Sequence, residues 1–152
     1  MERSYHIRPA RGKDEQSVKG LLLDSNLPLE GVDEHFEESY CVAESQDHII
    51  GVAGIEVYGS HGLLRSCAVD SEWRKRSIGE ALVKNRLSWA RANELSDVYL
   101  ITTDADHYFK RFGFRAVNRS SVPDEIKESS EFSTICPETA TVMVRSVQES
   151  RI

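Results

Sequence analysis

Long apolar runs and an excess of positive charge are both missing from this chain of 152 residues. No stretch approaches the roughly 20 apolar residues that a membrane-spanning helix needs. The N-terminal residues, Met1–Ser4, begin no apolar signal segment. Lys and Arg number 19 against 25 Asp and Glu, which gives a net charge of −6 and argues against general nucleic-acid binding. We therefore expect a cytoplasmic protein with no membrane and no nucleic acid among its partners.

Cysteine is scarce and histidine is scattered. Cys41, Cys67 and Cys136 form no Cys-x-x-Cys pair, and such isolated cysteines are more often buried reduced thiols than disulfides or metal ligands. The five histidines lack ligand spacing, so we expect no metal. Two phosphate-binding motifs are also absent, the Gly-Lys-Ser/Thr of a P-loop and Gly-x-Gly-x-x-Gly. The length and a hydrophobic content of 39% favour one domain, residues 1–152, with its own core.

The most informative stretch joins an apolar run to a basic segment. Leu63–Val69 predicts a buried strand, and the Arg-Lys-Arg run at 74–76 precedes a helix predicted over Ile78–Asn93. The first amides of a helix lack partners within it, and the helix dipole favours negative charge there. Three cations alone are more often a solvated surface. The preceding strand and the small residues Ser77 and Gly79 favour an anion site instead.

Three successive segments, Ser39–Glu44, Ile49–Tyr58 and Leu63–Val69, predict an antiparallel meander with a hairpin loop at Gly59–Gly62. The wide apolar arc of the long helix fits a crossover to a parallel strand at Asp97–Thr102. We also predict strands at Tyr5–Pro9, Phe114–Val117 and Thr141–Val147, helices at Asp14–Asp24 and Asp104–Phe112, and a helical turn or loop at Val122–Ser129. Irregular chain is predicted at Ser130–Thr139 and at Leu29–Glu38, where one more helical turn is the alternative.

Residues two apart on a strand point to the same face. Along the second strand of the meander, this alternation places Ile50 on the face of Val52. Along the third strand, it places Arg65 on the face of Cys67.

Residues 69–79 resemble the cofactor-binding motif of the GNAT superfamily of acyl-CoA-dependent N-acetyltransferases. In that family a strand ending in Val is followed by a short connection and by Arg/Gln-x-x-Gly-x-Gly/Ala at the start of a helix. Here the motif reads Val69, then Arg74-x-x-Ser77-x-Gly79, so that a serine replaces the first glycine. The segment YFKRFGF at Tyr108–Phe114 is similar to LYEKLGF, whose helix lies under the cofactor. The resemblance spans nearly the whole chain.

The implied fold is mixed α/β, a single GNAT-type domain. Its central sheet is mostly antiparallel and twisted, splays between strands four and five, and carries helices on both faces. The implied co-substrate is acetyl-CoA, with no metal. The basic loop and the first helical amides would bind the pyrophosphate, and a backbone N–H near the end of strand four would meet the thioester carbonyl. The implied cofactor-binding residues are Cys67, Ala68, Val69, Arg74, Lys75, Arg76, Ser77, Ile78, Gly79, Glu80, Ala81, Asp104 and Phe109.

The resemblance leaves the catalytic groups open. In many of these enzymes a Glu of strand four acts as the base through water, but the matching residue here is Leu63. Glu56 is the best substitute, and its alternative role is a cross-strand ion pair with Arg65. The family's common acid, a Tyr, matches Phe109, whereas Tyr108 is one helix step away and more often a packing residue. Water is the alternative acid for the leaving thiolate.

Three segments resemble one subgroup of this superfamily. Ile55–Gly59, Leu63–Val69 and residues between Glu131 and Met143 are similar to the arsenic-resistance N-acetyltransferases, relatives of phosphinothricin acetyltransferase. The acceptor implied is a small amino-acid-like amine, phosphinothricin- or arsenical-like. The implied acceptor-binding residues are Arg65, Ser66 and Phe36. Alternatives are a protein or peptide N-acetyltransferase and a non-catalytic acyl-CoA-binding sensor, and a homodimer stays open.

Overall fold

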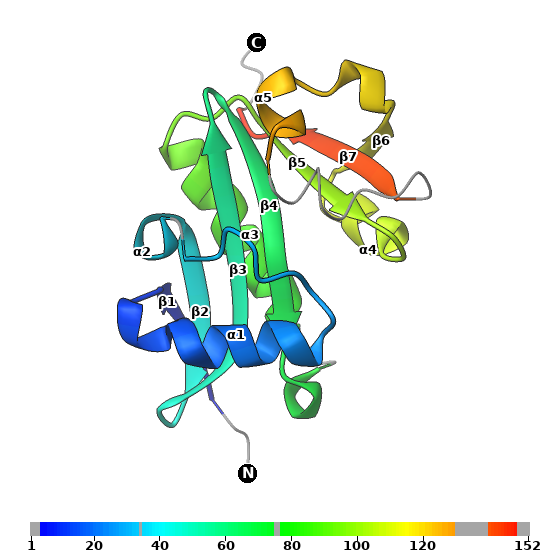
Figure 1. The fold of residues 1–152 in the computed structure, drawn as a ribbon. Helices are drawn as coiled ribbons and strands as arrows, with labels where there is room; N and C mark the ends of the chain where they lie inside the picture. The colour runs from blue at the N-terminus through cyan, green and yellow to red at the C-terminus, as the bar shows by residue number, and fades with distance from the viewer. Residues whose placement is uncertain (1–3, 34, 75–76, 130–139, 149–152) are drawn as a thin grey trace. The chain divides into compact units, whose positions relative to one another are not determined.

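Hydrogen bonds connect the strands in the order β1-β2-β3-β4-β5-β7-β6 (Figure 1). The computed structural model describes residues 4–33, 35–74, 77–129 and 140–148. Within these ranges the strands are β1 (His6–Pro9), β2 (Tyr40–Ser45), β3 (His48–Tyr58), β4 (His61–Val69), β5 (Asp97–Thr102), β6 (Arg115–Val117) and β7 (Thr141–Ser146). The α-helices are α1 (Glu15–Asp24), α2 (Phe36–Ser39), α3 (Ile78–Ala92), α4 (Asp106–Lys110) and α5 (Asp124–Lys127). Three 3₁₀ turns are η1 (Gly12–Asp14), η2 (Ser71–Trp73) and η3 (Arg119–Ser121).

The strand directions confirm the predicted mixed α/β fold with a mostly antiparallel sheet. The pairs β1–β2, β2–β3, β5–β7 and β6–β7 are antiparallel. The pair β4–β5 is parallel, as the crossover through α3 predicts.

Two groups of residues each have their own dense set of internal contacts. The first comprises residues 1–55 and 66–86, and the second comprises residues 56–65 and 87–152. The chain passes between these groups inside β3, β4 and α3 rather than in loops. We call them the first unit and the second unit.

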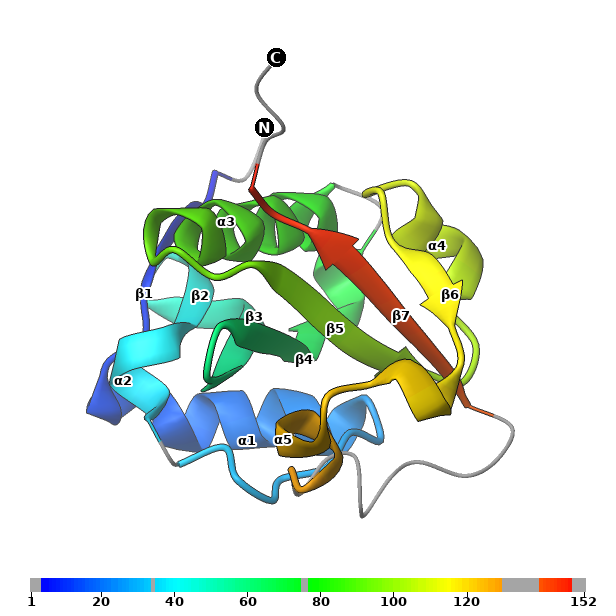
Figure 2. The ribbon, with the colours of Figure 1, turned by 90° about the horizontal axis from the view of Figure 1, so that it is seen from above.

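The first unit has helices on both faces of its strands. One apolar cluster lies on the α1 side and contains Val18, Leu21, Leu22, Val42 and Val52. The other lies on the α3 side and contains Cys41, Ala43, Ala53, Ile78 and Leu82. Figure 2 shows α1 and α3 on opposite sides of β2 and β3. Successive residues of β2 contribute to opposite clusters because strand side chains alternate. Each cluster is covered by a helix, which confirms the prediction of helices on both faces.

A bulge in β3 changes the faces that simple alternation predicts. The register with β2 shifts between Ala43 and Glu44, where Ile50 is the extra residue. Ile50 packs in the α3-side cluster, whereas Val52 packs in the α1-side cluster. The prediction that these two side chains share a face is therefore wrong, because an inserted residue exchanges the faces beyond it.

In the second unit, β5 lies between β4 and β7. Its parallel pairing with β4 covers three residue pairs and ends at Leu63 and Tyr99. Its antiparallel pairing with β7 continues to Thr102 and Thr141. The pairing of β4 with β5 thus stops part-way along both strands, as the predicted splay requires. An apolar cluster under α5 contains Leu63, Tyr99, Val122, Ile126, Val142 and Val144.

Most element boundaries lie within two residues of the prediction. The helix predicted over 104–112 is shorter, Asp106–Lys110, and its start follows a turn in which the Ala105 amide donates to Thr102 Oγ1 at 2.9 Å. The predicted hairpin loop is also shorter, because β4 already begins at His61. Residues 130–139, predicted to be irregular, lie outside the described residues. Among the described helices, none combines the length and apolar character needed to cross a membrane.

Candidate active site

The connection between β4 and α3 is fixed by hydrogen bonds of Asp70. Its amide donates to the carbonyl of Ile50 at 2.8 Å, and its Oδ1 accepts from the Glu72 amide at 2.9 Å. The amide of Trp73 donates to the Asp70 carbonyl at 2.9 Å, and the Trp73 side chain is buried in the α3-side cluster. These contacts hold the loop from which the exposed Arg74 projects, and Arg74 Nε donates back to the Val69 carbonyl at 3.1 Å.

The start of α3 presents a set of donors to an anion. Its first intrahelical bond runs from the Ala81 amide to the Ser77 carbonyl at 3.1 Å, so the amides of 78–80 precede the helical ladder. Ile78 is buried and anchors the helix, and Arg74 adds a full positive charge. Helical amides, the dipole of a 15-residue helix and a cation suit a pyrophosphate. Lys75 and Arg76, predicted for this site, lie outside the described residues.

Ser77 has a left-handed backbone conformation. Its φ is 61°, a region where glycine is favoured and a side chain costs about 1–2 kcal/mol. The resemblance places a glycine of the cofactor motif at this position. The backbone therefore follows the path expected of that glycine, with a serine bearing the strain. The neighbouring positions Gly79, Glu80 and Ala81 are half-buried, and Glu80 accepts from Lys84 Nζ at 3.0 Å along the helix.

The C-terminal half of β4 contains a second residue with a positive φ, Ser66 at 60°. Its hydroxyl lies 3.4 Å from that of Tyr40, and both residues are buried. The Tyr40 ring covers Gly54, where a Cβ would come within 2.5 Å of it, and lies 5.3 Å from the Phe36 ring. Ser66 and Phe36, predicted to bind the acceptor, are thus parts of one buried stack in the first unit.

The last residues of β4 alternate between the two apolar clusters of the first unit. Ala68 packs in the α1-side cluster, and Cys67 and Val69 pack against the α3-side cluster. The regular alternation between Arg65 and Cys67 is interrupted by the positive φ of Ser66. The premise that Arg65 and Cys67 share a face therefore does not hold.

Glu56 lies in a hydrogen-bonded group of the second unit. Its Oε1 accepts from the Tyr58 hydroxyl at 2.8 Å, and its Oε2 accepts from Arg65 Nη1 at 3.1 Å. The predicted Glu56–Arg65 ion pair is therefore present. The Arg65 side chain has no exposed surface, and that of Glu56 is 11% exposed. Burial, and then the hydrogen bond to Glu56, raise the pKa of Tyr58, so this phenol remains a donor at neutral pH.

The proposed chemistry of Glu56 and Arg65 depends on these contacts. A carboxylate whose two oxygens both accept hydrogen bonds still has lone pairs for a water, and its narrow exposed edge is where a water would reach it. An arginine without exposed surface reaches an acceptor only if its neighbours move. The base role of Glu56 stays a prediction, and burial gives no support to the acceptor role of Arg65.

The predicted cofactor residues of the second unit are Asp104 and Phe109. Asp104 is exposed before α4. Phe109 is half-buried, with its ring edge-on to Tyr108 at 5.2 Å and to Phe114 at 6.0 Å. The guanidinium of Arg111 lies 5.5 Å from the centre of the Tyr108 ring. Tyr108 thus packs among rings and a cation, the packing role predicted for it.

Arg86 of α3 is a buried cation that the sequence analysis did not single out. Its Nη1 donates to the Ser39 carbonyl at 2.7 Å, and its Nη2 donates to Asn85 Oδ1 at 2.8 Å. Burial lowers the pKa of Arg86 and raises that of the neighbouring Cys41 thiol. Spacing gave a signal, because Arg86 follows Ile78 and Leu82 in steps of four along the apolar face of the helix. For Tyr58, the sequence indicated only that the residue lies on a strand.

The sequence of this chain matches a known protein family. The model of the acetyltransferase (GNAT) family matches residues 9–114. The chain is similar to an amino-acid acetyltransferase of Mycobacterium tuberculosis, with 31% identity over 134 residues, 79% of this chain and 74% of that protein.

Two solved structures have the same fold. The complex of Rv2747 from Mycobacterium tuberculosis with CoA has a TM-score of 0.77 at 26% identity and covers 93% of this chain and 98% of that chain. N-acetylglutamate synthase from Neisseria gonorrhoeae, complexed with coenzyme A and N-acetyl-glutamate, has a TM-score of 0.82 at 18% identity. This chain is covered to 98% but spans only 36% of the synthase chain. Because the family model matches more than half of its residues, the chain belongs to the acetyltransferase (GNAT) family.

Proposed function

We propose that the protein transfers the acetyl group of acetyl-CoA to the α-amino group of a small amino-acid-like acceptor. An acetyltransferase of this family has acetyl-CoA as its co-substrate. The observation that carries the choice of acceptor is the 31% identity to an amino-acid acetyltransferase along 74% of that protein. The complex of N-acetylglutamate synthase with N-acetyl-glutamate adds a fold-level parallel.

The donor set at the start of α3 supports a site for the CoA pyrophosphate. In the proposal, Arg74, Lys75 and Arg76 supply charge, and the amides from Ser77 to Glu80 supply directed hydrogen bonds, whereas the predicted amide of Ala81 already donates to the Ser77 carbonyl. Asp104 and Phe109 would bind other parts of the co-substrate. Near Cys67, Ala68 and Val69, a backbone N–H would donate to the thioester carbonyl as negative charge develops on its oxygen.

Acetyl transfer forms a C–N bond and breaks the thioester C–S bond. The acceptor must first lose the ammonium proton, because only the neutral amine has a lone pair to attack. Glu56 is the proposed base, acting through a water at its exposed edge, while Arg65 and Tyr58 keep its carboxylate oriented. Phe109 has no hydroxyl, so water is the proposed acid for the leaving thiolate.

A panel of acceptors tests the proposal. Release of free CoA thiol from acetyl-CoA is followed with neutral and acidic amino acids, phosphinothricin, an arsenical amino acid, polyamines and lysine peptides. We expect turnover with amino acids and their phosphinate or arsenical analogues, and little with polyamines or peptides. Strong activity on peptides alone would support the protein N-acetyltransferase alternative. Tight acetyl-CoA binding without any turnover would support an acyl-CoA sensor. The predicted cytoplasmic location stays a prediction.

A further inference from the structure

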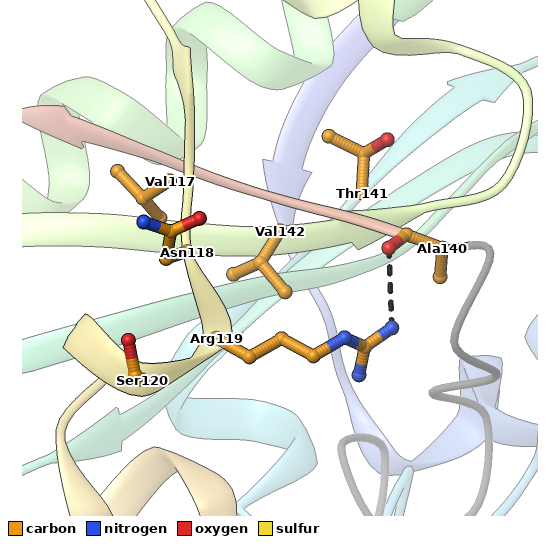
Figure 3. Close-up of a pocket in the computed structure, with 7 residues that line it drawn as sticks. All are labelled: Val117, Asn118, Arg119, Ser120, Ala140, Thr141 and Val142. Atoms are coloured by element: carbon orange, nitrogen blue, oxygen red, sulfur yellow. Dashed lines mark hydrogen bonds between the residues drawn. The ribbon is translucent and has the colours of Figure 1, made fainter.

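A hollow of about 500 Å³ lies in the second unit, between the end of β6 with η3 and the start of β7 (Figure 3). Seven of the described residues line it: Val117, Asn118, Arg119, Ser120, Ala140, Thr141 and Val142. Arg119 is the one charged side chain among these seven described residues. Figure 3 shows its side chain running past Val142 toward Ala140. The lining thus combines one cation, an amide and hydroxyls with two valines.

The guanidinium of Arg119 is held in position by its surroundings. Its Nη2 donates to the Ala140 carbonyl at 3.1 Å. The turn below it is closed by the Ser121 hydroxyl and amide, which donate to the Asn118 carbonyl at 2.8 and 3.0 Å. The following residue, Val122, is buried in the cluster under α5. A planar guanidinium fixed in this way is suited to a carboxylate, which it binds with parallel hydrogen bonds.

The hollow opens at an end of the sheet that is close to the predicted chemistry of the second unit. Thr141 pairs with Thr102, the last residue of β5, and Asp104 follows two residues later. Val142 and Val117 pack in or against the same cluster as Tyr58, the hydrogen-bond partner of Glu56. The hollow therefore shares a face of the sheet with the Tyr58 side chain.

The opposite face of these strands carries α4. Along β7, Val144 packs under α5, whereas the next residue, Arg145, donates to the Phe112 carbonyl just beyond α4. Because successive strand residues point to opposite faces, the hollow and the Phe112 carbonyl lie on opposite faces of β7. A ligand in the hollow would thus leave the α4 face to the co-substrate.

The lining residues also lie beyond the part of the chain that the family model matches. The family model ends at residue 114, and the described lining of the hollow comes from residues 117–120 and 140–142. Features that differ between relatives, such as the choice of acceptor, are expected in such a region.

We propose that this hollow binds the anionic side-chain group of an acidic amino-acid acceptor, with Arg119 as the residue that selects for the charge. This inference rests on the proposed function. The valines suit the methylene carbons of such a side chain, and the guanidinium suits its terminal carboxylate or phosphinate.

Paired acceptors of nearly equal shape test the inference. L-Glutamate and L-glutamine differ at the side-chain end by a charge, and kcat and KM are measured for both, together with KM for acetyl-CoA. The wild type should prefer glutamate. Arg119→Gln can still donate to the Ala140 carbonyl but lacks the charge, and it should raise the KM for glutamate about tenfold or more. Its KM for glutamine and for acetyl-CoA should stay within about twofold, and Arg119→Lys should be intermediate.

Arg115→Gln is the matched control. It removes the same charge from an exposed position of β6 outside the seven lining residues and should keep the preference for glutamate. Equal kinetics of wild type and Arg119→Gln on glutamate would overturn the inference, as would a wild type that prefers glutamine. Both results leave the proposed function standing, whereas absence of turnover with any amino acid would remove both. If Arg119→Gln fails to fold, the inference is tested by the wild-type preference for glutamate over glutamine and by the KM of Arg119→Lys for glutamate.

Discussion

Ser77 combines backbone strain with a position in the proposed pyrophosphate site. At a φ of 61° a small side chain is tolerated, but a β-branched one is a steric outlier. Ser77→Val should therefore distort the start of α3 and raise the dissociation constant for acetyl-CoA about tenfold or more, measured by titration calorimetry. Ser77→Gly relieves the strain and should bind at least as tightly as the wild type. Equal affinities of the Val and Gly variants would show that this backbone angle has no part in binding.

The proposed role of Glu56 as the base can be tested by comparing a variant of Glu56 with a variant of its hydrogen-bond partner Tyr58. Glu56→Gln removes the proposed base and should lower kcat roughly 100-fold while KM for acetyl-CoA stays unchanged. Tyr58→Phe removes one hydrogen bond to the carboxylate but leaves the carboxylate itself, so kcat should fall by less than about tenfold. Both variants are followed by kcat against pH. A Gln variant with full activity and an unchanged pH profile would make Glu56 a structural partner of Arg65.

Single residues of the site differ in how far the sequence predicts them. Arg74 and Ser77 could be identified because a strand, a basic loop and a helix start are adjacent in the chain. The Glu56–Arg65 pair followed from hairpin register, but its burial did not, because burial depends on packing by distant segments. Arg119 gave no signal, since a lone cation in a polar turn looks like any surface residue until β6 and β7 pair.

Among the elements, β1 and the start of α1 are joined by the side chain of Arg8. Its Nη1 and Nη2 donate to the two carboxylate oxygens of Asp14 at 2.8 and 3.0 Å, and its Nε donates to Glu44 Oε1 at 2.9 Å. The Asp14 carboxylate also accepts from the Arg11 amide at 2.8 Å. The hydrogen bonds from Arg8 lower the pKa of Asp14 below its ordinary value of 3.8 and also lower that of Glu44.

This arrangement predicts how stability depends on pH. A carboxyl whose pKa is lowered on folding stabilises the protein above its unfolded pKa, and that stabilisation is lost as pH falls from about 4 through the lower folded value. Asp14→Asn should reduce the free energy of unfolding at pH 7 by about 2 kcal/mol, because a buried charge-assisted pair is broken. It should also flatten the loss of stability between pH 5 and 3. Urea unfolding at several pH values measures both, and a variant with the wild-type pH dependence would contradict the assignment.

Elements were predictable where side-chain periodicity is regular and not where one residue breaks it. The periodicity of β5 and α3 predicted their bounds closely. The bulge at Ile50 and the positive φ of Ser66 were not predictable, because neither residue type favours such a conformation. Each irregularity changes which side chains share a face, so the inferred faces failed although the strands themselves were right.

For the whole molecule, binding at the start of α3 should appear as a change in thermal stability. A ligand at 100 times its dissociation constant stabilises the folded state by about 2.7 kcal/mol. For a protein of this size, that corresponds to a rise in Tm of roughly 5–10 °C. We expect this rise with CoA in differential scanning fluorimetry. Gly79→Glu, which adds bulk and negative charge among the first helical amides, should abolish most of it.

The control for this experiment is Ser88→Glu, which adds the same charge at an exposed position of the same helix. It should keep the full CoA-induced rise in Tm. A rise in the Gly79→Glu variant as large as in the wild type would place the CoA site elsewhere on the protein.

The chain passes between its two units inside β3, β4 and α3. This has a consequence for where its gene can be cut. Borders between separable domains usually fall in exposed linkers, where a gene can be cut or fused without damage. Here a gene fragment that ends after residue 86 still encodes residues 56–65 of the second unit, and the remaining fragment lacks them. Such a cut therefore leaves the second unit incomplete in both fragments. A recombination point at residue 86 would also separate the strand, basic loop and helix start from the segment that contains Arg119.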